Sequence, residues 1–198
     1  MTSTITRVHR FTVGEFIAMD EAGILPDDRH YELIRGEIVE MPPIGPGHAG
    51  EVDELGQRLT LMFGTSVLIR SQGPIQLDDI SLPQPDLVLL RPRGDYYRDS
   101  HPTPADIYLV VEVADTTERY DRKVKRPLYA QAGIVEHWLI ALRKREVEVS
   151  RDPGPEDYRQ TRTLRRGDRL DSVALPGWEI AVDELFGGSA RRQVDGRG

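Results

Sequence analysis

The chain has 198 residues, of which 38% are hydrophobic and none is cysteine. This length can bury one core, so we expect a single domain over residues 1–186, and the lack of cysteine excludes disulfides, thiolate metal sites and cysteine nucleophiles. The net charge of −7 counts against tight nonspecific binding to nucleic acid, because such binding comes mainly from Lys and Arg.

We expect no secretory signal in the first residues of the sequence. The stretch MTSTITRVHRFTVGEF has no apolar core, and no apolar run in the sequence reaches 18 residues. The absence of cysteine agrees with a reducing compartment. We therefore expect a cytoplasmic protein that does not associate with a membrane.

Two short elements are predicted near the N-terminus. Thr12 and Glu15 have the spacing of a capping box, which predicts a helix that ends at Gly23. The segments HYELI and EIVEM are separated by an Arg-Gly pair, which predicts a β-hairpin over His30–Glu40 because Gly adopts positive φ easily.

A loop and a longer helix follow the hairpin. The segment MPPIGPGHAG is rich in Pro and Gly and predicts a loop up to Gly50. From Ala49 to Gly64 apolar residues recur at helical spacing, which predicts a helix with one buried side. The apolar positions are Val52, Leu55, Leu59 and Met62.

The central part of the chain predicts a βαβ unit. Apolar runs at residues 66–70 and 85–90 predict two strands, and a richer run predicts a third over Ile107–Val113. A crossover helix leads from it to a further strand over His137–Leu142. The right-handed crossover rule makes the last two strands parallel neighbours, so the predicted fold class is mixed α/β.

The crossover helix itself is expected over Asp121–Ala132, with Gly133 as its C-cap. Pro127 must lie in the first turn of this helix or kink it. The helix could therefore begin just before Pro127, or it could begin earlier and be kinked at Pro127.

Antiparallel strands are predicted after the central unit. They cover residues 146–150, 158–164 and parts of RLDSVALPGWEIAVDELF, where Trp178 and Phe186 are expected to close the core. Residues 187–198 lack enough apolar surface to become ordered, so we predict a disordered tail.

Two acidic residues stand next to the apolar strands. Glu112 lies near the end of a strand that is otherwise apolar, and Asp86 begins the strand before it. An antiparallel pairing of these strands would bring both carboxylates to one edge of the sheet, where a single cation could bind them. Asp86 could instead be a turn residue, and Glu112 could form a structural ion pair with Arg119 or Lys125.

Several segments together resemble a known family. PDLVLL, LVVEVAD, DRKVKRPLYAQAGIVEHWLI and YELIRGEIVEMPP are similar to the bacterial family named putative restriction endonucleases, a branch of the PD-(D/E)XK nuclease-like fold. The resemblance runs from about Phe11 to Phe186. It implies a restriction-endonuclease-like mixed β-sheet flanked by helices, with added antiparallel strands at the N- and C-terminal ends.

The resemblance implies the catalytic residues. Asp86 takes the place of the PD acid and Glu112 that of the second acid, whereas Ala114 stands where the wider fold has a lysine. In the narrower family a lysine from the crossover helix takes that role, and Lys125 is in this register, with Lys123 as its competitor. Both lysines could also belong to a solvated basic face.

Two accessory positions also match the family. His48 could contact phosphate or modulate a metal-bound water, or it could be a structural loop histidine. Glu32 could face the same cleft or pair with Arg35.

The predicted function is a Mg²⁺-dependent endonuclease that hydrolyses DNA, for which Mn²⁺ should substitute. Asp86 and Glu112 would supply the carboxylates that Mg²⁺ takes in proteins. We expect a homodimer, because two sites related by a two-fold axis suit the cutting of two strands. The loop between Arg91 and Pro104 is the candidate for reading bases. The alternative is a nuclease-fold protein without catalysis that serves as a DNA-binding or regulatory module.

Overall fold

The computed structural model describes residues 7–186 and shows a mixed α/β fold. The helices are α1 (Val13–Glu21), α2 (Pro46–Phe63), α3 (Glu118–Tyr120), α4 (Arg126–Gln131) and α5 (Val182–Leu185). The strands are β1 (His30–Ile34), β2 (Glu37–Met41), β3 (Leu68–Ser71), β4 (Leu87–Leu90), β5 (Ile107–Ala114), β6 (Glu136–Ala141), β7 (Glu146–Pro153), β8 (Tyr158–Leu164), β9 (Arg169–Asp171) and β10 (Glu179–Ala181). The predicted tail at residues 187–198 lies outside the described residues.

A six-stranded sheet with the order β3-β4-β5-β6-β7-β8 forms the centre of the molecule. Only β5 and β6 pair in parallel, and the other neighbours in this sheet are antiparallel. The predicted βαβ unit is confirmed, because α3 and α4 cross between these two parallel strands.

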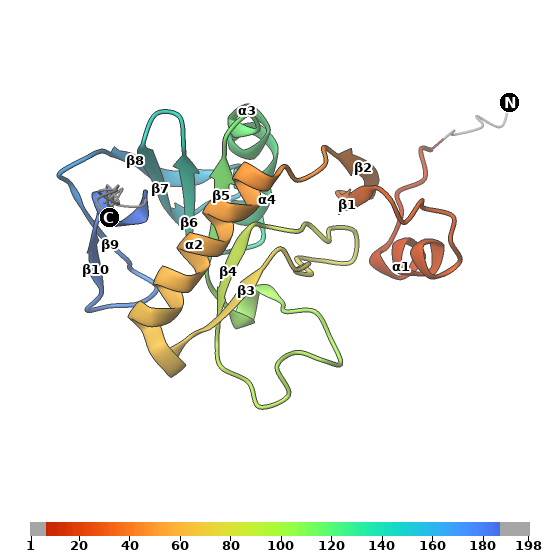
Figure 1. Ribbon diagram of the computed structural model, residues 1–198. Helices are drawn as coiled ribbons and strands as arrows, with labels where there is room; N and C mark the ends of the chain where they lie inside the picture. The colour runs from red at the N-terminus through yellow and green to blue at the C-terminus, as the bar shows by residue number, and fades with distance from the viewer. Residues whose placement is uncertain (1–6, 187–198) are drawn as a thin grey trace, which may run out of the picture.

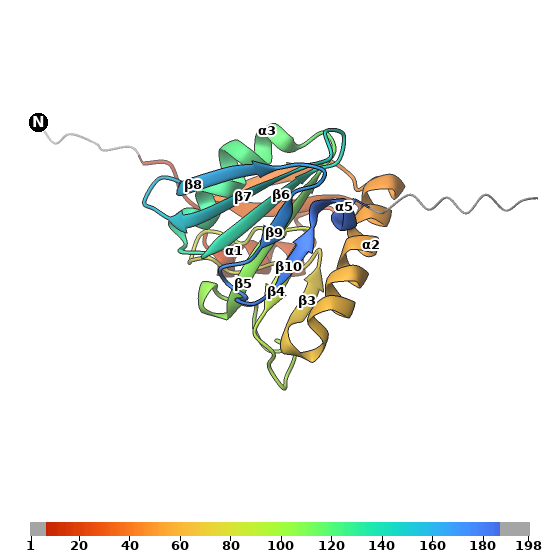
Figure 2. The ribbon, with the colours of Figure 1, turned by 90° about the vertical axis from the view of Figure 1, so that its left-hand side faces the viewer.

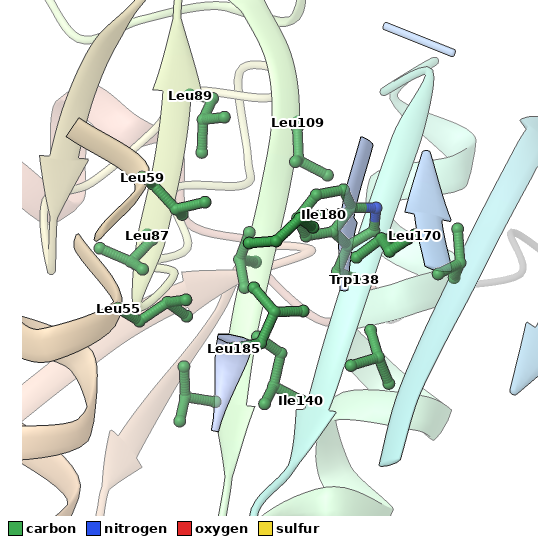
Figure 3. Close-up of a cluster of buried hydrophobic side chains, with 14 of the residues drawn as sticks. Leu55, Leu59, Leu87, Leu89, Leu109, Trp138, Ile140, Leu170, Ile180 and Leu185 are labelled. Atoms are coloured by element: carbon green, nitrogen blue, oxygen red, sulfur yellow. The ribbon is translucent and has the colours of Figure 1, made fainter. Parts of the chain in front are cut away.

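One face of the sheet is covered by α2 together with the C-terminal elements β9, β10 and α5 (Figures 1 and 2). Leucine side chains of α2 meet the apolar side chains of β4, β5 and β6 (Figure 3). The alternation of side chains along a strand decides which residues take part. Leu87, Leu89, Val111 and Val113 lie on this face.

The other face carries the second core, which α4 covers. Val88, Leu90 and Val110 point to this side, where they pack with Leu128 and Tyr129. Because side chains alternate, Asp86 and Glu112 belong by parity to this face. The α4 face of the sheet is therefore the one that holds the two acidic residues.

The N-terminal elements form a separate small layer beside the sheet, away from β9 and β10 (Figure 1). Thr12 caps α1 with the predicted capping box to Glu15. The predicted hairpin is also confirmed, with Arg35 and Gly36 both at positive φ in the turn. A side chain at position 36 would collide with Arg10, whose Cβ lies 2.6 Å from the place of the missing Cβ.

Two sequence-based boundaries are wrong. Helix α2 begins at Pro46, inside the segment predicted to be a loop, because proline is well suited to the first turn of a helix. The crossover begins at Glu118 and contains a π-helical turn over Asp121–Lys125, directly before α4. Pro127 then lies in the first turn of α4, where its missing N–H costs little.

In residues 7–186, no helix combines the length and the apolar character that crossing a membrane requires.

Candidate active site

The pairing of β4 with β5 brings Asp86 and Glu112 together. The two strands are antiparallel, as predicted, with Leu87 opposite Val111. The next pair outward is Asp86 opposite Glu112, and Oδ2 of Asp86 accepts a hydrogen bond of 2.8 Å from the backbone N–H of Val113. Asp86, directly before β4, and Glu112, on the neighbouring strand β5, therefore lie side by side on the same face.

Glu112 is held inside the protein by two partners. It is 2% exposed, its Oε1 accepts a hydrogen bond of 2.6 Å from the Tyr129 hydroxyl, and the same oxygen lies 3.2 Å from Nζ of Lys125. Burial raises the pKa of Glu112 well above its usual value, although the charge of Lys125 opposes this effect. Of the two structural partners considered for Glu112, the structure selects Lys125.

Lys125 enters the cleft from the π-helical turn. Its ammonium lies 3.1 Å from Oε1 of Glu32 and donates a hydrogen bond of 3.4 Å to the carbonyl oxygen of Gln84. Burial acts to lower the pKa of Lys125, but the carboxylates of Glu112 and Glu32 outweigh it and raise the pKa. Lys123, its competitor, is exposed to solvent.

Glu32 lies in the same cleft and does not pair with Arg35, which donates instead to Gln131. Glu32 is 1% exposed, and in the described part of the chain neither of its carboxylate oxygens accepts a hydrogen bond. The distance between Oε1 of Glu32 and Nζ of Lys125 is that of an ion pair, but the angle between these groups does not allow a hydrogen bond. A buried carboxylate with such incomplete pairing is costly unless a cation or donor completes its shell.

His48 is a helix residue rather than the loop residue that the sequence predicted. It lies in the first turn of α2, and its Nε2 is 2.8 Å from Oδ1 of Asp86. The hydrogen bond to Asp86 raises the pKa of His48, although partial burial opposes this. Asp86 is therefore held between His48 on one oxygen and a backbone N–H on the other.

These residues line one cleft with a volume of about 130 Å³. Met41, the two following prolines and Ile44 form an apolar wall between β2 and α2. The polar residues of the cleft are His30, Glu32, His48, Gln72, Gln84, Asp86, Glu112, Asp115, Thr116, Thr117, Asp121 and Lys125. The structure thus brings all the predicted site residues except Lys123 to one place.

Sequence reasoning did not find two residues of this region. Asp121 is buried at the edge of the cleft, where burial raises its pKa to about 6 in spite of the nearby charge of Lys125. Tyr129 lies within the segment 121–132 predicted as the crossover helix, but nothing in the sequence links it to Glu112. The spacing of four residues from Asp121 to Lys125 and again to Tyr129 was the available signal, because residues four apart share a helix face.

The donor set suits a hard divalent cation. Carboxylate and carbonyl oxygens predominate in the cleft, and one ammonium faces several carboxylates, of which Glu32 accepts no hydrogen bond from the described residues. In residues 7–186, no three His, Cys, Asp or Glu side chains form a group that could hold a metal ion by themselves. Mg²⁺ commonly takes only one or two carboxylates and completes its shell with water and substrate oxygens.

The loop between Arg91 and Pro104 lies away from this cleft. It leaves β4 at Leu90, whereas Asp86 precedes the opposite end of that strand. The loop instead borders a second pocket of about 490 Å³ beside the C-terminal end of α2. Tyr97 anchors it by donating a hydrogen bond of 2.8 Å to the carbonyl oxygen of Arg91.

Comparisons with known proteins agree with this architecture. A search of curated proteins found no match. The fold is similar to that of a crystal structure described as a putative nuclease belonging to DUF820 from Anabaena variabilis ATCC 29413, with a TM-score of 0.65 and 16% identity over 89% of this chain and 97% of the other. This likeness confirms the predicted fold class. The family model Uma2, described as "Putative restriction endonuclease", matches residues 13–183. Because that match spans most of the sequence, the chain belongs to the Uma2 family of putative restriction endonucleases.

Proposed function

We propose that this protein is a metal-dependent endonuclease that hydrolyses phosphodiester bonds of DNA, with Mg²⁺ or Mn²⁺ as its cofactor. The observation that carries the proposal is the meeting of Asp86, Glu112 and Lys125 in one cleft. Two neighbouring strands and a helix from a different part of the chain supply these groups. Membership of the family supports the same chemistry and DNA as the substrate.

Asp86 and Glu112 would hold the cation through their carboxylates, with water and substrate oxygens completing its shell, while Glu32 would hold Lys125 in the same cleft. When bound, the divalent cation neutralises charge on the scissile phosphate and lowers the pKa of the attacking water. Lys125 supplies a fixed ammonium that can donate to a phosphate oxygen as negative charge grows on it. Its burial between two carboxylates limits its motion, so the donor is oriented before substrate binds.

His48 has a positioning role in this proposal. The bond from Nε2 to Asp86 holds one carboxylate oxygen in place, and α2 carries the imidazole at the rim of the cleft. The raised pKa of His48 favours the protonated ring, which donates to Asp86. Binding of a cation at Asp86 would compete with that proton.

The alternative is a nuclease-fold module that binds DNA or a regulatory partner without cutting. Three observations favour it. Ala114 occupies the position where the wider fold has its lysine, and Lys125 is already engaged by Glu32 and Glu112. The net charge of −7 also weakens electrostatic attraction to DNA unless a cation neutralises the cleft.

Metal binding and plasmid cleavage separate the two functions. Titration calorimetry with Mn²⁺ should show binding to the wild type and to Asp99→Ala, an exposed acid on the distant loop, but not to Asp86→Ala. Supercoiled plasmid incubated with the wild type and Mn²⁺ should be nicked, and a chelator should stop the reaction. If neither the wild type nor Asp86→Ala binds the metal, the enzyme proposal fails and the binding module remains.

A further inference from the structure

We infer that Tyr129 is a positioning residue, whose hydroxyl orients Glu112 for the cation. This inference rests on the proposed function. Tyr129 is completely buried on α4, and its hydroxyl donates a hydrogen bond of 2.6 Å to Oε1 of Glu112. It would not touch substrate, so its contribution would act through the carboxylate.

The two partners of Glu112 approach the same oxygen. Tyr129 and Lys125 both meet Oε1, at 2.6 Å and 3.2 Å. Because both partners contact Oε1, the other carboxylate oxygen of Glu112, Oε2, is the one that a cation can bind. The pair therefore selects one orientation of a carboxylate that could otherwise rotate.

The two partners respond differently when a cation arrives. A divalent cation repels the ammonium of Lys125, which weakens the attraction between Lys125 and Glu112, while Glu32, 3.1 Å away, keeps the ammonium in the cleft. The neutral phenol experiences no such repulsion. Tyr129 is the partner suited to hold Glu112 in the cation-bound state.

The surroundings of Tyr129 make it a rigid support. It follows Lys125 by four residues, so both side chains leave the same side of the crossover toward the sheet. Its ring packs against His137 of β6, with ring centroids 5.5 Å apart. A second tyrosine, Tyr158 of β8, also packs against that histidine, with ring centroids 6.2 Å apart.

Tyr158 provides a matched control. It is 7% exposed and faces the same core, but its buried hydroxyl has no hydrogen-bond partner among the described residues. Replacement by Phe removes one hydroxyl from each tyrosine and leaves both rings in place. Only Tyr129→Phe removes a hydrogen bond to Glu112.

The test compares the wild type, Tyr129→Phe and Tyr158→Phe in Mn²⁺ calorimetry and in plasmid nicking as a function of Mn²⁺ concentration. Loss of a hydrogen bond that orients a metal ligand typically weakens metal affinity about 10–100-fold. We expect a loss of this size for Tyr129→Phe, with nicking largely recovered at saturating Mn²⁺. Tyr158→Phe should behave like the wild type.

If Tyr129 had only a structural role, Tyr129→Phe would lower the fraction of folded protein but would not change the Mn²⁺ concentration that nicking requires. Thermal unfolding with and without Mn²⁺ is therefore measured for all three proteins. Equal Mn²⁺ affinity in the two variants would overturn the inference and leave the proposed function standing. Absence of Mn²⁺ binding by the wild type would overturn both. If Tyr129→Phe is unfolded without metal, its melting temperature is followed as Mn²⁺ is added. Stabilisation of this variant at the same Mn²⁺ concentration that stabilises the wild type would overturn the inference.

Discussion

Lys125 is the residue on which the chemistry and the electrostatics of the cleft most depend. Lys125 is 3% exposed, and its ammonium faces both Glu32 and Glu112. The structure describes no other lysine in the lining of this cleft. The charge of Lys125 therefore balances the buried acids and, in the proposed reaction, stabilises the phosphate.

Substitution of Lys125 by Ala should reduce plasmid nicking by about 100-fold or more, the scale expected when one group that stabilises charge is lost. The rate is measured at saturating Mn²⁺. The matched control is Lys123→Ala, which removes an exposed lysine two residues away and should keep nearly full activity.

Folding must be measured beside activity, because removal of one partner of a buried ion pair can cost about 3–5 kcal/mol. Urea unfolding with and without Mn²⁺ separates loss of fold from loss of chemistry, since a bound cation should replace part of the missing charge. If Lys125→Ala is folded and nicks plasmid at the wild-type rate, and Lys123→Ala nicks it much more slowly, the catalytic lysine is Lys123.

At the scale of elements, strand β6 is joined to the C-terminal segment by a buried carboxylate. Oε1 of Glu136 accepts from Trp138 and from the guanidinium of Arg151. Oε2 accepts from the Ser172 hydroxyl at 2.7 Å and from the backbone N–H of Val173 at 2.9 Å. This network ties the loop between β9 and β10 to the sheet, and it gives Glu136 a structural role in a segment that resembles the family.

Replacement of Glu136 by Gln should lower the free energy of unfolding by about 1–3 kcal/mol, because Arg151 would keep only Asp171 as a charged partner and the new amide N–H₂ would meet hydrogen-bond donors. Urea denaturation measures this change. The exposed Glu156→Gln is the control and should stay within about 0.5 kcal/mol of the wild type. Equal midpoints for the two variants would contradict the structural role.

At the scale of the whole molecule, cutting both strands of a DNA duplex would take two active sites or two successive reactions at one site. The described chain has one cleft that combines the two acids with the buried lysine. A two-fold symmetric dimer would present two such clefts to the two strands. We therefore predict a homodimer in solution.

Sedimentation velocity over a range of protein concentrations tests this prediction, and the expected result is a species with twice the mass of the chain. The same measurement with a short DNA duplex and Ca²⁺ shows whether substrate promotes the dimer. A monomer under all these conditions, with linear product formed only after nicked circles accumulate, would show that the protein cuts one strand at a time.

Much of the fold followed from local signals. Thr12 and Glu15 predicted the start of α1, and the Arg-Gly pair predicted the hairpin, because capping and turn geometry depend on residues close in sequence. The apolar runs predicted the strands β4, β5 and β6, and the crossover rule predicted the parallel pair. The acidic residues were visible because they interrupt or adjoin apolar strands.

The tertiary structure alone decided how the site is assembled. Whether Asp86 lies beside Glu112 depends on the register of two strands, and a shift of one residue would turn one acid to the other face. The choice of Lys125 over Lys123 depends on the rotation of the crossover, which the π-helical turn sets. The sequence alone therefore determined the elements and the candidate acids, whereas the contacts of Tyr129 and Glu32 needed the folded chain, because they join residues far apart in sequence.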